Sequence, residues 1–397
     1  MLEEASNMAA QASVPIAAPI SKAEVKEDRF IAIDMLRGIA MLLMALDHWA
    51  AFARVNITAE GYDGVRPALG GAFHIFTGLL TNLASGIFFT LTGTSIAFFE
   101  RSRRKRGWTE WEITRFLLIR AGILLVLDQV VNFVGWHVTD LPLFEVLSAL
   151  AFGLIVLAFA RHLPLKVIAI GAGVLFLGYP LLVMLFPHNP DQPLSAVTTI
   201  LLQNHRASFP NVETPFLGRL SLVLAGYVLG RLLREGKISI QPQWLWVATG
   251  GLVAWLVLRL GVLNGYGDYM PYNSQDGWLS FLIDSKHPPS LTFLLFNMSL
   301  SLMLLVGLQS LSVRLKDTAI SWVLTILGQT SLFFFVLHML FYKLLEVVFN
   351  GSFIPSSLIS YDIIRLYLEC ALTMVVLLPI CYAYRNLRRK YSILSYL

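Results

Sequence analysis

The chain has 397 residues, of which 56% are hydrophobic and only 14% are charged, and its mean hydropathy is +0.67. Soluble proteins carry about 25% charged residues, so this chain lacks the charge to cover two or three soluble domains. The same composition excludes a disordered, collagen-like or disulfide-rich chain. It predicts an all-α, polytopic integral membrane protein built as a helical bundle.

The N-terminal segment 1–28 mixes polar and apolar residues and predicts a flexible cytoplasmic tail. About ten apolar stretches of membrane-spanning length follow it. In chain order they lie near 31–52, 72–99, 114–136, 141–160, 166–186, 216–233, 244–263, 290–312, 320–348 and 362–384. The ninth is long enough to tilt or kink. Together they predict one transmembrane domain over 29–390, with a short tail at 391–397.

The distribution of lysine and arginine predicts how the helices are oriented. If the N-terminus is cytoplasmic, every inner connection carries basic residues, including the run RSRRKR at 101–106, whereas the outer loops hold few. Cytoplasmic loops are enriched in basic residues, so the pattern predicts an N-in, C-in topology. The net charge of +5 is thereby explained by topology and contact with membrane lipids, and no nucleic-acid partner is expected.

With this orientation, seven of the eight histidines fall in outer loops or at outer helix ends, namely His48, His74, His137, His188, His205, His287 and His338. Chance accounts for part of this skew, because the outer loops are also longer. Histidine is the side chain best suited to proton transfer near neutral pH, so such chemistry is expected on the outer side. The chain has no CxxC and no Cys/His cluster with metal-ligand spacing, and no metal is expected.

Charged residues within the first span are candidates for function, because ionisable groups inside a bilayer are costly. Near its inner end, Asp34 and Arg37 are three residues apart and can pair. At its outer end, about 20 Å further along, Asp47 adjoins His48. The inner pair fits either an interfacial charge pair or a cofactor site. The outer pair fits either an interfacial polar cap or an acid beside a catalytic imidazole.

Polar side chains of other spans are expected to converge on the outer half of the bundle, as an outward-opening cavity requires. They are His74, Asn82, Asp128, Asn132, Glu145 and His338. Arg120 lies in the inner half of its span instead. Small residues such as Gly218, Gly226 and Gly230 predict close helix packing.

The outer loop 264–289 is dense in Tyr, Trp, Asn and Asp and holds Asp268, Lys286 and His287. Aromatic rings with polar groups beside them suit the stacking and hydroxyl recognition of sugars. The same composition also fits an interfacial aromatic belt. The sequence leaves both interpretations open.

Six segments together resemble the bacterial branch of the heparan-alpha-glucosaminide N-acetyltransferase-like family of membrane proteins. They are IDMLRGIAMLLMALDH (33–48), FFTLTGTSIAFF (88–99), FLGRLSLVLAGYVLGR (216–231), NGYGD (264–268), SFLIDSKHPPSL (280–291) and LGQTSLFFFVLHML (327–340). The resemblance implies a helical membrane acyltransferase. It would take acetyl groups from cytosolic acetyl-CoA and deliver them to a sugar amine or hydroxyl on the far side of the membrane.

The resemblance also implies roles for single residues. Asp34 and Arg37 match the family's signature in the first helix, and Asp47 with His48 matches an Asp-His pair of bacterial relatives. His74 is the nearest counterpart of the lysosomal catalytic histidine. Many bacterial relatives have Thr-His where this chain has Thr81-Asn82.

The resulting hypothesis is an acetyltransferase of the bacterial cytoplasmic membrane with acetyl-CoA as donor. Arg37, Arg120 or the 101–106 run would hold the donor phosphates, near Asp34. His48 or His74 would take the acceptor proton, with Asp47 orienting an imidazole, and Asn82 or Lys286 would stabilise the oxyanion. The residues expected around the acceptor are Asp128, Asn132, Glu145, Asp268, Lys286, His287 and His338.

Two other classes of protein fit the composition. A multi-pass transporter or flippase for a glycan or lipid-linked substrate would also need buried charges and an outer cavity, although we find no inverted repeat in the sequence. A non-catalytic membrane scaffold or sensor explains the helices but not the polar cluster. Both a monomer and a homodimer stay open.

Overall fold

The computed structural model describes residues 31–62, 65–140, 142–186, 194–205, 209–261, 266–270, 272, 277–391, 394 and 396. The predicted N-terminal tail and His188 lie outside these residues. The helices are α2 (Ile31–Phe52), α3 (Ala72–Lys105), α4 (Glu110–Val130), the π-helical turn η1 (Val131–Gly135), α5 (Val146–Ala160), α6 (Leu165–Leu185), α7 (Ala196–Leu201), α8 (Phe216–Arg234), α9 (Trp244–Arg259), the 3₁₀ turn η3 (Trp278–Leu282), α10 (Leu291–Leu315), α11 (Ala319–Gln329), α12 (Ser331–Phe349) and α13 (Asp362–Lys390).

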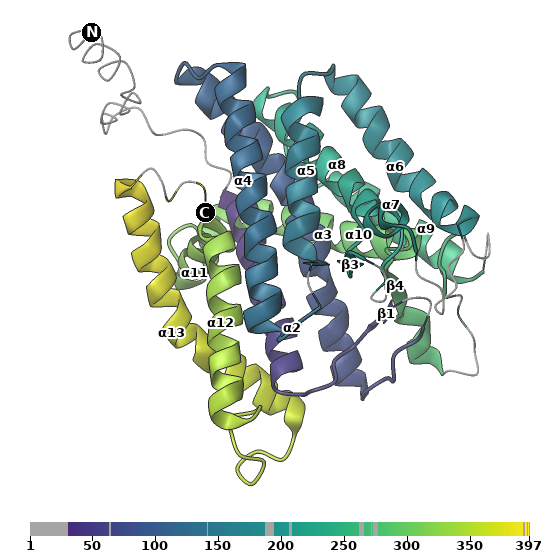
Figure 1. The fold of residues 1–397 in the computed structure, drawn as a ribbon, viewed down its shortest axis with the longest axis vertical. Coiled ribbons are helices and arrows are strands. Elements are labelled where there is room, and N and C mark those ends of the chain that lie inside the picture. The colour runs from purple at the N-terminus through teal and green to yellow at the C-terminus, as the bar shows by residue number, and fades with distance from the viewer. Residues whose placement is uncertain are drawn as a thin grey trace, which may run out of the picture.

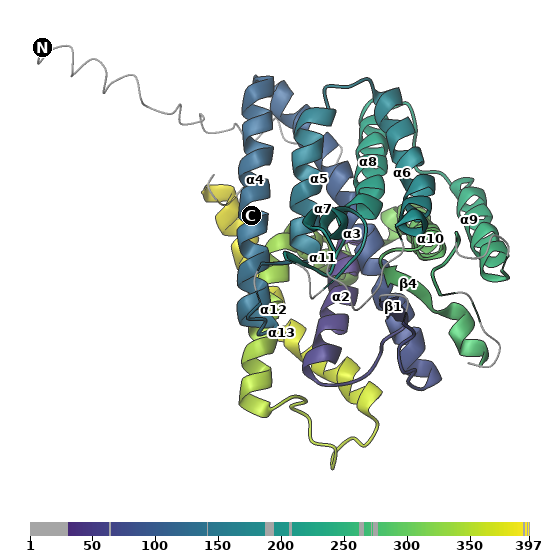
Figure 2. The same ribbon diagram turned by 45° about the vertical axis from the view of Figure 1, so that its right-hand side comes forward.

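Four very short strands accompany the helices described above (Figure 1). Strand β1 (Glu60–Tyr62) pairs in parallel with β4 (Asp284–His287), and β2 (Leu143–Phe144) pairs in parallel with β3 (Asn211–Val212). Figure 2 shows β1 and β4 midway along the bundle, and they contact α3 and α10 respectively. These pairs bring loops that are distant in sequence to the same side of the molecule.

The predicted class, an all-α polytopic membrane protein, is confirmed. Among the described residues, seven helices are long and apolar enough to cross a membrane: α3, α4 with η1, α6, α8, α10, α12 and α13. Helices α5, α9 and α11 are also apolar but have only 15, 16 and 11 residues. The first helix, α2, has the predicted bounds and buries most of its residues inside the bundle.

The predicted spans 141–160 and 320–348 differ from the structure. In the first, α5 starts only at Val146. The backbone at Leu143 stays extended, because its carbonyl oxygen accepts hydrogen bonds from the side chains of Gln129 (3.0 Å) and Asn132 (2.9 Å). The second span is two helices that meet at Thr330. Arginine side chains satisfy the carbonyls at this break: Arg37 donates to Gly328 O and Arg388 to Gln329 O, both at 3.1 Å.

Helices α3 and α8 pack backbone to backbone, as the small residues predict. A Cβ atom on Gly226 would lie 1.9 Å from the carbonyl oxygen of Thr90, and one on Gly93 would lie 1.9 Å from that of Val223. The Thr94 hydroxyl donates to Gly226 O at 3.0 Å across the same contact. Glycine at these positions therefore sets the distance between the two helices.

Substituting Gly226 by valine should destabilise the bundle, because the added side chain must push α8 away from α3. Overpacking of this kind costs about 1–3 kcal/mol. Gly122→Val on α4 is the matched control, since a Cβ atom there meets nothing within 4 Å. Thermal unfolding in detergent should show a lower midpoint for Gly226→Val only. Equal midpoints for the two variants would contradict the packing argument.

Ion pairs join the helix ends that were predicted to face the cytoplasm. Arg161, just after α5, contacts Glu110 of α4 at 2.5 Å and Glu100 of α3 at 3.2 Å. Tyr227 of α8 donates to Glu100 at 2.6 Å, and Arg101 donates to the Arg234 carbonyl. These ends therefore lie together at one end of the bundle, the upper end in Figure 1, where α5 leads into α6. The N-in, C-in orientation stays a prediction.

Candidate active site

Two of the cavities among the described residues contain predicted site residues. We call the one lined by Asp47, His48 and Lys286 the outer cavity and the one lined by Arg37 and Arg120 the inner cavity, after the predicted orientation. The outer cavity has a volume of about 670 Å³. It is lined by residues of α2, α3, α5, α8 and α12, by the chain before and within β1, by the connections before α5 and α8, and by β4. The inner cavity has a volume of about 240 Å³ and lies among α2, α3, α4, α5 and the α11–α12 break. The Phe88 side chain of α3 forms part of both walls. The two cavities therefore adjoin at this residue.

Asp47 and His48 both line the outer cavity, but each has its own hydrogen-bond partner. The Thr81 hydroxyl donates to Asp47 at 2.8 Å. The Nδ1 atom of His48 lies 2.8 Å from Nε2 of His338. Within the described chain the predicted Asp47–imidazole contact is replaced by a histidine pair.

Lys286 carries a positive charge into the same cavity from β4. Its Nζ atom lies 2.8 Å from Oε1 of Glu60 and 3.1 Å from Oδ1 of Asn82. Burial favours the neutral amine, but the nearby negative charges of Glu60 and Asp47 outweigh it and hold the pKa of Lys286 above its ordinary value. The lysine is therefore charged at neutral pH. Asn82 is buried behind it and accepts its hydrogen bond.

A buried cluster of ion pairs contacts the start of β4. Arg259 of α9 donates to Asp268 and lies 3.5 Å from Asp284, which also accepts from Trp255 at 3.0 Å. The Arg259 side chain is fully buried, so removing one carboxylate would leave its charge poorly compensated. The cluster fixes the strand that carries Lys286 and His287.

His287, the next residue of β4, is held by backbone and ring contacts. Its Nδ1 atom donates to the Glu213 carbonyl at 2.6 Å, and its ring stacks on Tyr62 with centroids 4.6 Å apart. Arg219 of α8 donates to the Lys286 carbonyl at 3.2 Å. All of these side chains line the outer cavity.

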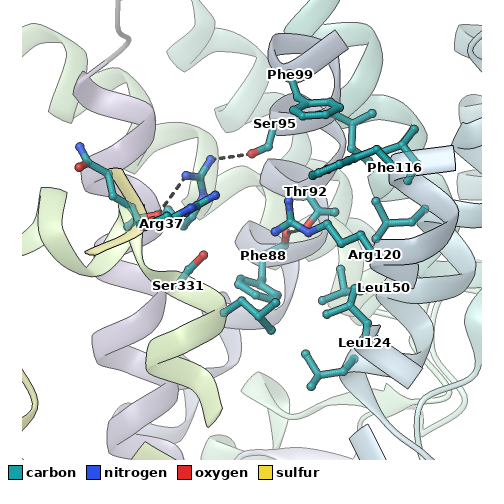
Figure 3. A pocket seen from close by; sticks show the side chains of 18 residues that line it. Arg37, Phe88, Thr92, Ser95, Phe99, Phe116, Arg120, Leu124, Leu150 and Ser331 are labelled. Atoms are coloured by element: carbon teal, nitrogen blue, oxygen red, sulfur yellow. Dashed lines mark hydrogen bonds between the residues drawn. The ribbon is translucent and has the colours of Figure 1, made fainter. Parts of the chain in front are cut away.

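Arginine side chains define the inner cavity, which Figure 3 shows from close by. Arg37 and Arg120 reach into it from α2 and α4 on opposite sides, and Arg388 of α13 also lines it. Arg37 donates to the Ser95 hydroxyl at 2.7 Å and pairs with Asp34 at 3.4 Å, as predicted. Arg120 makes no hydrogen bond or ion pair to any residue that the structure describes. Its guanidinium group is therefore available to an anion.

The predicted site residues that line a cavity are Asp47, His48, Glu145, Lys286 and His287 in the outer one and Arg37 and Arg120 in the inner one. Asp34 and Asn82 lie behind them, as partners of Arg37 and Lys286. His338 is fully buried behind His48. It is therefore placed to support the site rather than to touch an acceptor.

Four other predicted residues have structural contacts away from the cavity walls. His74 lies 3.1 Å from Asp362 at the start of α13. Asp128 caps α5, accepting from the amide nitrogens of Glu145 (2.8 Å) and Leu147 (3.3 Å). Asn132 and Asp268 hold β2 and β4, as described above.

Sequence reasoning missed several cavity-lining residues. Those of the outer cavity are Glu60, Tyr62, Glu213 and Arg219, and those of the inner cavity are Ser95 and Arg388. Arg219 carried a usable signal, because it is an ionisable residue within a predicted span. Glu60 carried none, since its partner Lys286 is 226 residues away in the sequence.

Comparison with known families gives one result. A family model described as an acyltransferase domain matches residues 30–385. No curated protein matches the chain. The broader part of the resemblance, to membrane acyltransferases, agrees with this match, and the heparan-alpha-glucosaminide N-acetyltransferase-like branch stays a prediction. Since the match spans most of the sequence, the chain belongs to the acyltransferase-domain family and is a multi-pass membrane acyltransferase.

Proposed function

We propose that the protein transfers an acetyl group from cytosolic acetyl-CoA to an amine or hydroxyl group of a sugar on the far side of a bacterial cytoplasmic membrane. One observation carries this proposal: an arginine-lined cavity and a histidine-lined cavity share the Phe88 ring as a wall. The first suits an anionic donor and the second suits proton transfer. A thioester moved past Phe88 would pass from one to the other.

The donor side is supported by the charges of Arg37, Arg120 and Arg388. Guanidinium groups bind phosphate oxygens through charge-assisted hydrogen bonds, and Arg120 is not engaged with other described residues. Phe99 and Phe116 give the same cavity apolar walls, which suit the pantetheine arm of coenzyme A. The diphosphate would stay near the arginines while the acetyl end points toward Phe88.

The acceptor side is supported by the polar lining of the outer cavity. Among the described residues that line it, carboxylates outnumber lysine and arginine: Asp47, Glu60, Asp140, Glu145 and Glu213 stand against Lys286 and Arg219. Carboxylates accept hydrogen bonds from hydroxyl and ammonium groups and repel anions. This lining favours a neutral or amine-bearing sugar over a phosphorylated or carboxylated one.

In the proposed reaction, the acceptor nitrogen or oxygen attacks the thioester carbonyl while His48 takes its proton. The negative charge that develops on the carbonyl oxygen is stabilised by the Lys286 ammonium group. Collapse of the tetrahedral intermediate breaks the carbon–sulfur bond, and the proton passes to the leaving thiolate. An acetyl-histidine intermediate would use the same His48 ring.

Sealed proteoliposomes test this function. Vesicles loaded with glucosamine, N-acetylglucosamine or glucuronic acid receive acetyl-labelled acetyl-CoA outside. We expect labelled sugar inside the vesicles, with glucuronic acid the poorest acceptor. Donor and acceptor supplied together outside intact vesicles should give no product, because each protein exposes only one cavity to that solution. Intact acetyl-CoA together with passage of unmodified sugar would overturn the proposal in favour of a transporter.

A further inference from the structure

His338 is a buried histidine that the proposed reaction does not use directly. It lies on α12, is fully buried, and is not part of either cavity wall. Its Nε2 atom is 2.8 Å from His48 Nδ1, and its own Nδ1 atom is 2.8 Å from the carbonyl oxygen of Phe334, one helical turn earlier. The two imidazole planes differ by 4°. The geometry is that of a hydrogen-bonded chain ending on the backbone.

The direction of this chain follows from the chemistry of its members. A carbonyl oxygen only accepts, so Nδ1 of His338 must carry a hydrogen. A neutral imidazole with a hydrogen on Nδ1 has a bare Nε2, which can only accept. The hydrogen between the two rings therefore belongs to Nδ1 of His48. The nitrogen that His48 has left for the outer cavity is then an unprotonated Nε2.

The surroundings of His338 among the described residues offer no counter-ion for an imidazolium charge. Its neighbours are the rings of Phe334, Phe335 and Tyr342, with centroids 5.0, 5.7 and 5.3 Å away, and the His48 ring. No described carboxylate hydrogen-bonds to either histidine. Asp47, which adjoins His48 in the sequence, accepts a hydrogen bond from Thr81 instead. Burial among apolar rings disfavours a charged imidazolium.

We propose that His338 is a positioning residue that holds His48 in the tautomer with the hydrogen on Nδ1, so that Nε2 is the base. This inference rests on the proposed function for its catalytic meaning. When Nε2 takes the acceptor proton, His48 becomes an imidazolium and its bond to His338 becomes charge-assisted. That proton then leaves with the thiolate of coenzyme A. His338 keeps its own proton throughout.

Two variants of His338 distinguish its role as a hydrogen-bond acceptor for His48 from its role in filling space. His338→Phe keeps an aromatic ring but removes the acceptor, whereas the side-chain oxygen of His338→Gln can still accept from His48. We expect kcat to fall roughly 10²–10³-fold in His338→Phe, with the KM for acetyl-CoA unchanged, because general base catalysis is worth 10²–10⁴-fold. His338→Gln should recover at least tenfold of that loss. Equal activity of His338→Phe and the unmodified protein would overturn the proposal.

A spectroscopic measurement makes the test independent of activity. With nitrogen-15-labelled histidine, and His48→Gln to assign the signals, the unmodified protein should show His48 protonated at Nδ1 and bare at Nε2. The opposite tautomer would overturn the proposal outright. If the expected tautomer is found but the unmodified protein transfers no acetyl group, the proposed function fails and the positioning of His48 stands.

Discussion

Replacing His48 by alanine should abolish acetyl transfer, with kcat lowered roughly 10²–10⁴-fold, the usual contribution of a general base. The residue lines the outer cavity beside Asp47 and opposite Lys286, where an acceptor and a thioester would meet. Binding of acetyl-CoA should be unchanged, because the arginines of the inner cavity remain. Single-turnover rates with labelled acetyl-CoA and separate measurements of donor binding check both statements.

His74→Ala is the matched control for this prediction. The sequence allowed either histidine as the base, but His74 pairs with Asp362 and lies outside both cavity walls. Its alanine variant should keep most of the activity. An inactive His74→Ala beside an active His48→Ala would show that the base had been assigned to the wrong histidine.

Replacing Arg120 by alanine should raise the KM for acetyl-CoA roughly ten- to hundredfold, because a hydrogen bond to a charged group is worth about 1.5–3 kcal/mol. The guanidinium group enters the inner cavity and has no described partner to which its charge is already committed. Arg120→Lys should show a smaller rise, since lysine keeps the charge but not the forked geometry.

Two controls isolate the contact with phosphate. Arg115 lies on the same helix but is exposed and outside the cavity wall, so Arg115→Ala should bind the donor normally. Acetyl-pantetheine, which has no phosphate, should show the same KM with Arg120→Ala as with the unmodified protein. An increase of equal size for both donors would mean that Arg120 supports the fold of the cavity rather than the phosphates.

Much of the fold was accessible from hydropathy. The bounds of α2 agree with the predicted stretch 31–52, and most other spans differ only at their ends. The break at Thr330 was accessible only in part: the length of the stretch 320–348 indicated a tilt or kink, and GQTS at 328–331 interrupts its apolar pattern, but neither shows where one helix ends and the next begins. The last carbonyls of α11 are satisfied by two arginine side chains, Arg37 and Arg388, which come from distant parts of the chain.

The site was predictable where a polar residue stands in an apolar helix and faces a cavity, as Asp47, His48 and Arg120 do. The same rule also selected Asp128, which caps α5, because a buried carboxylate can equally cap a neighbouring helix and the sequence does not show which helix is its neighbour. Lys286 was identified, but its contact with Glu60 depends on the pairing of β1 with β4, which the sequence does not show.

The position of Phe88 has an electrical consequence. Because Phe88 belongs to the walls of both cavities, under the proposed function it lies in the insulating layer between the donor side and the acceptor side. A membrane potential falls mainly across such a layer, and each charge that crosses it gains or loses about 2.3 kcal/mol per 100 mV. An enzyme that passes an acyl group across this layer must open it without creating a path for protons. Under the proposed function, acyl passage and the ion gradient of the cell would compete at Phe88.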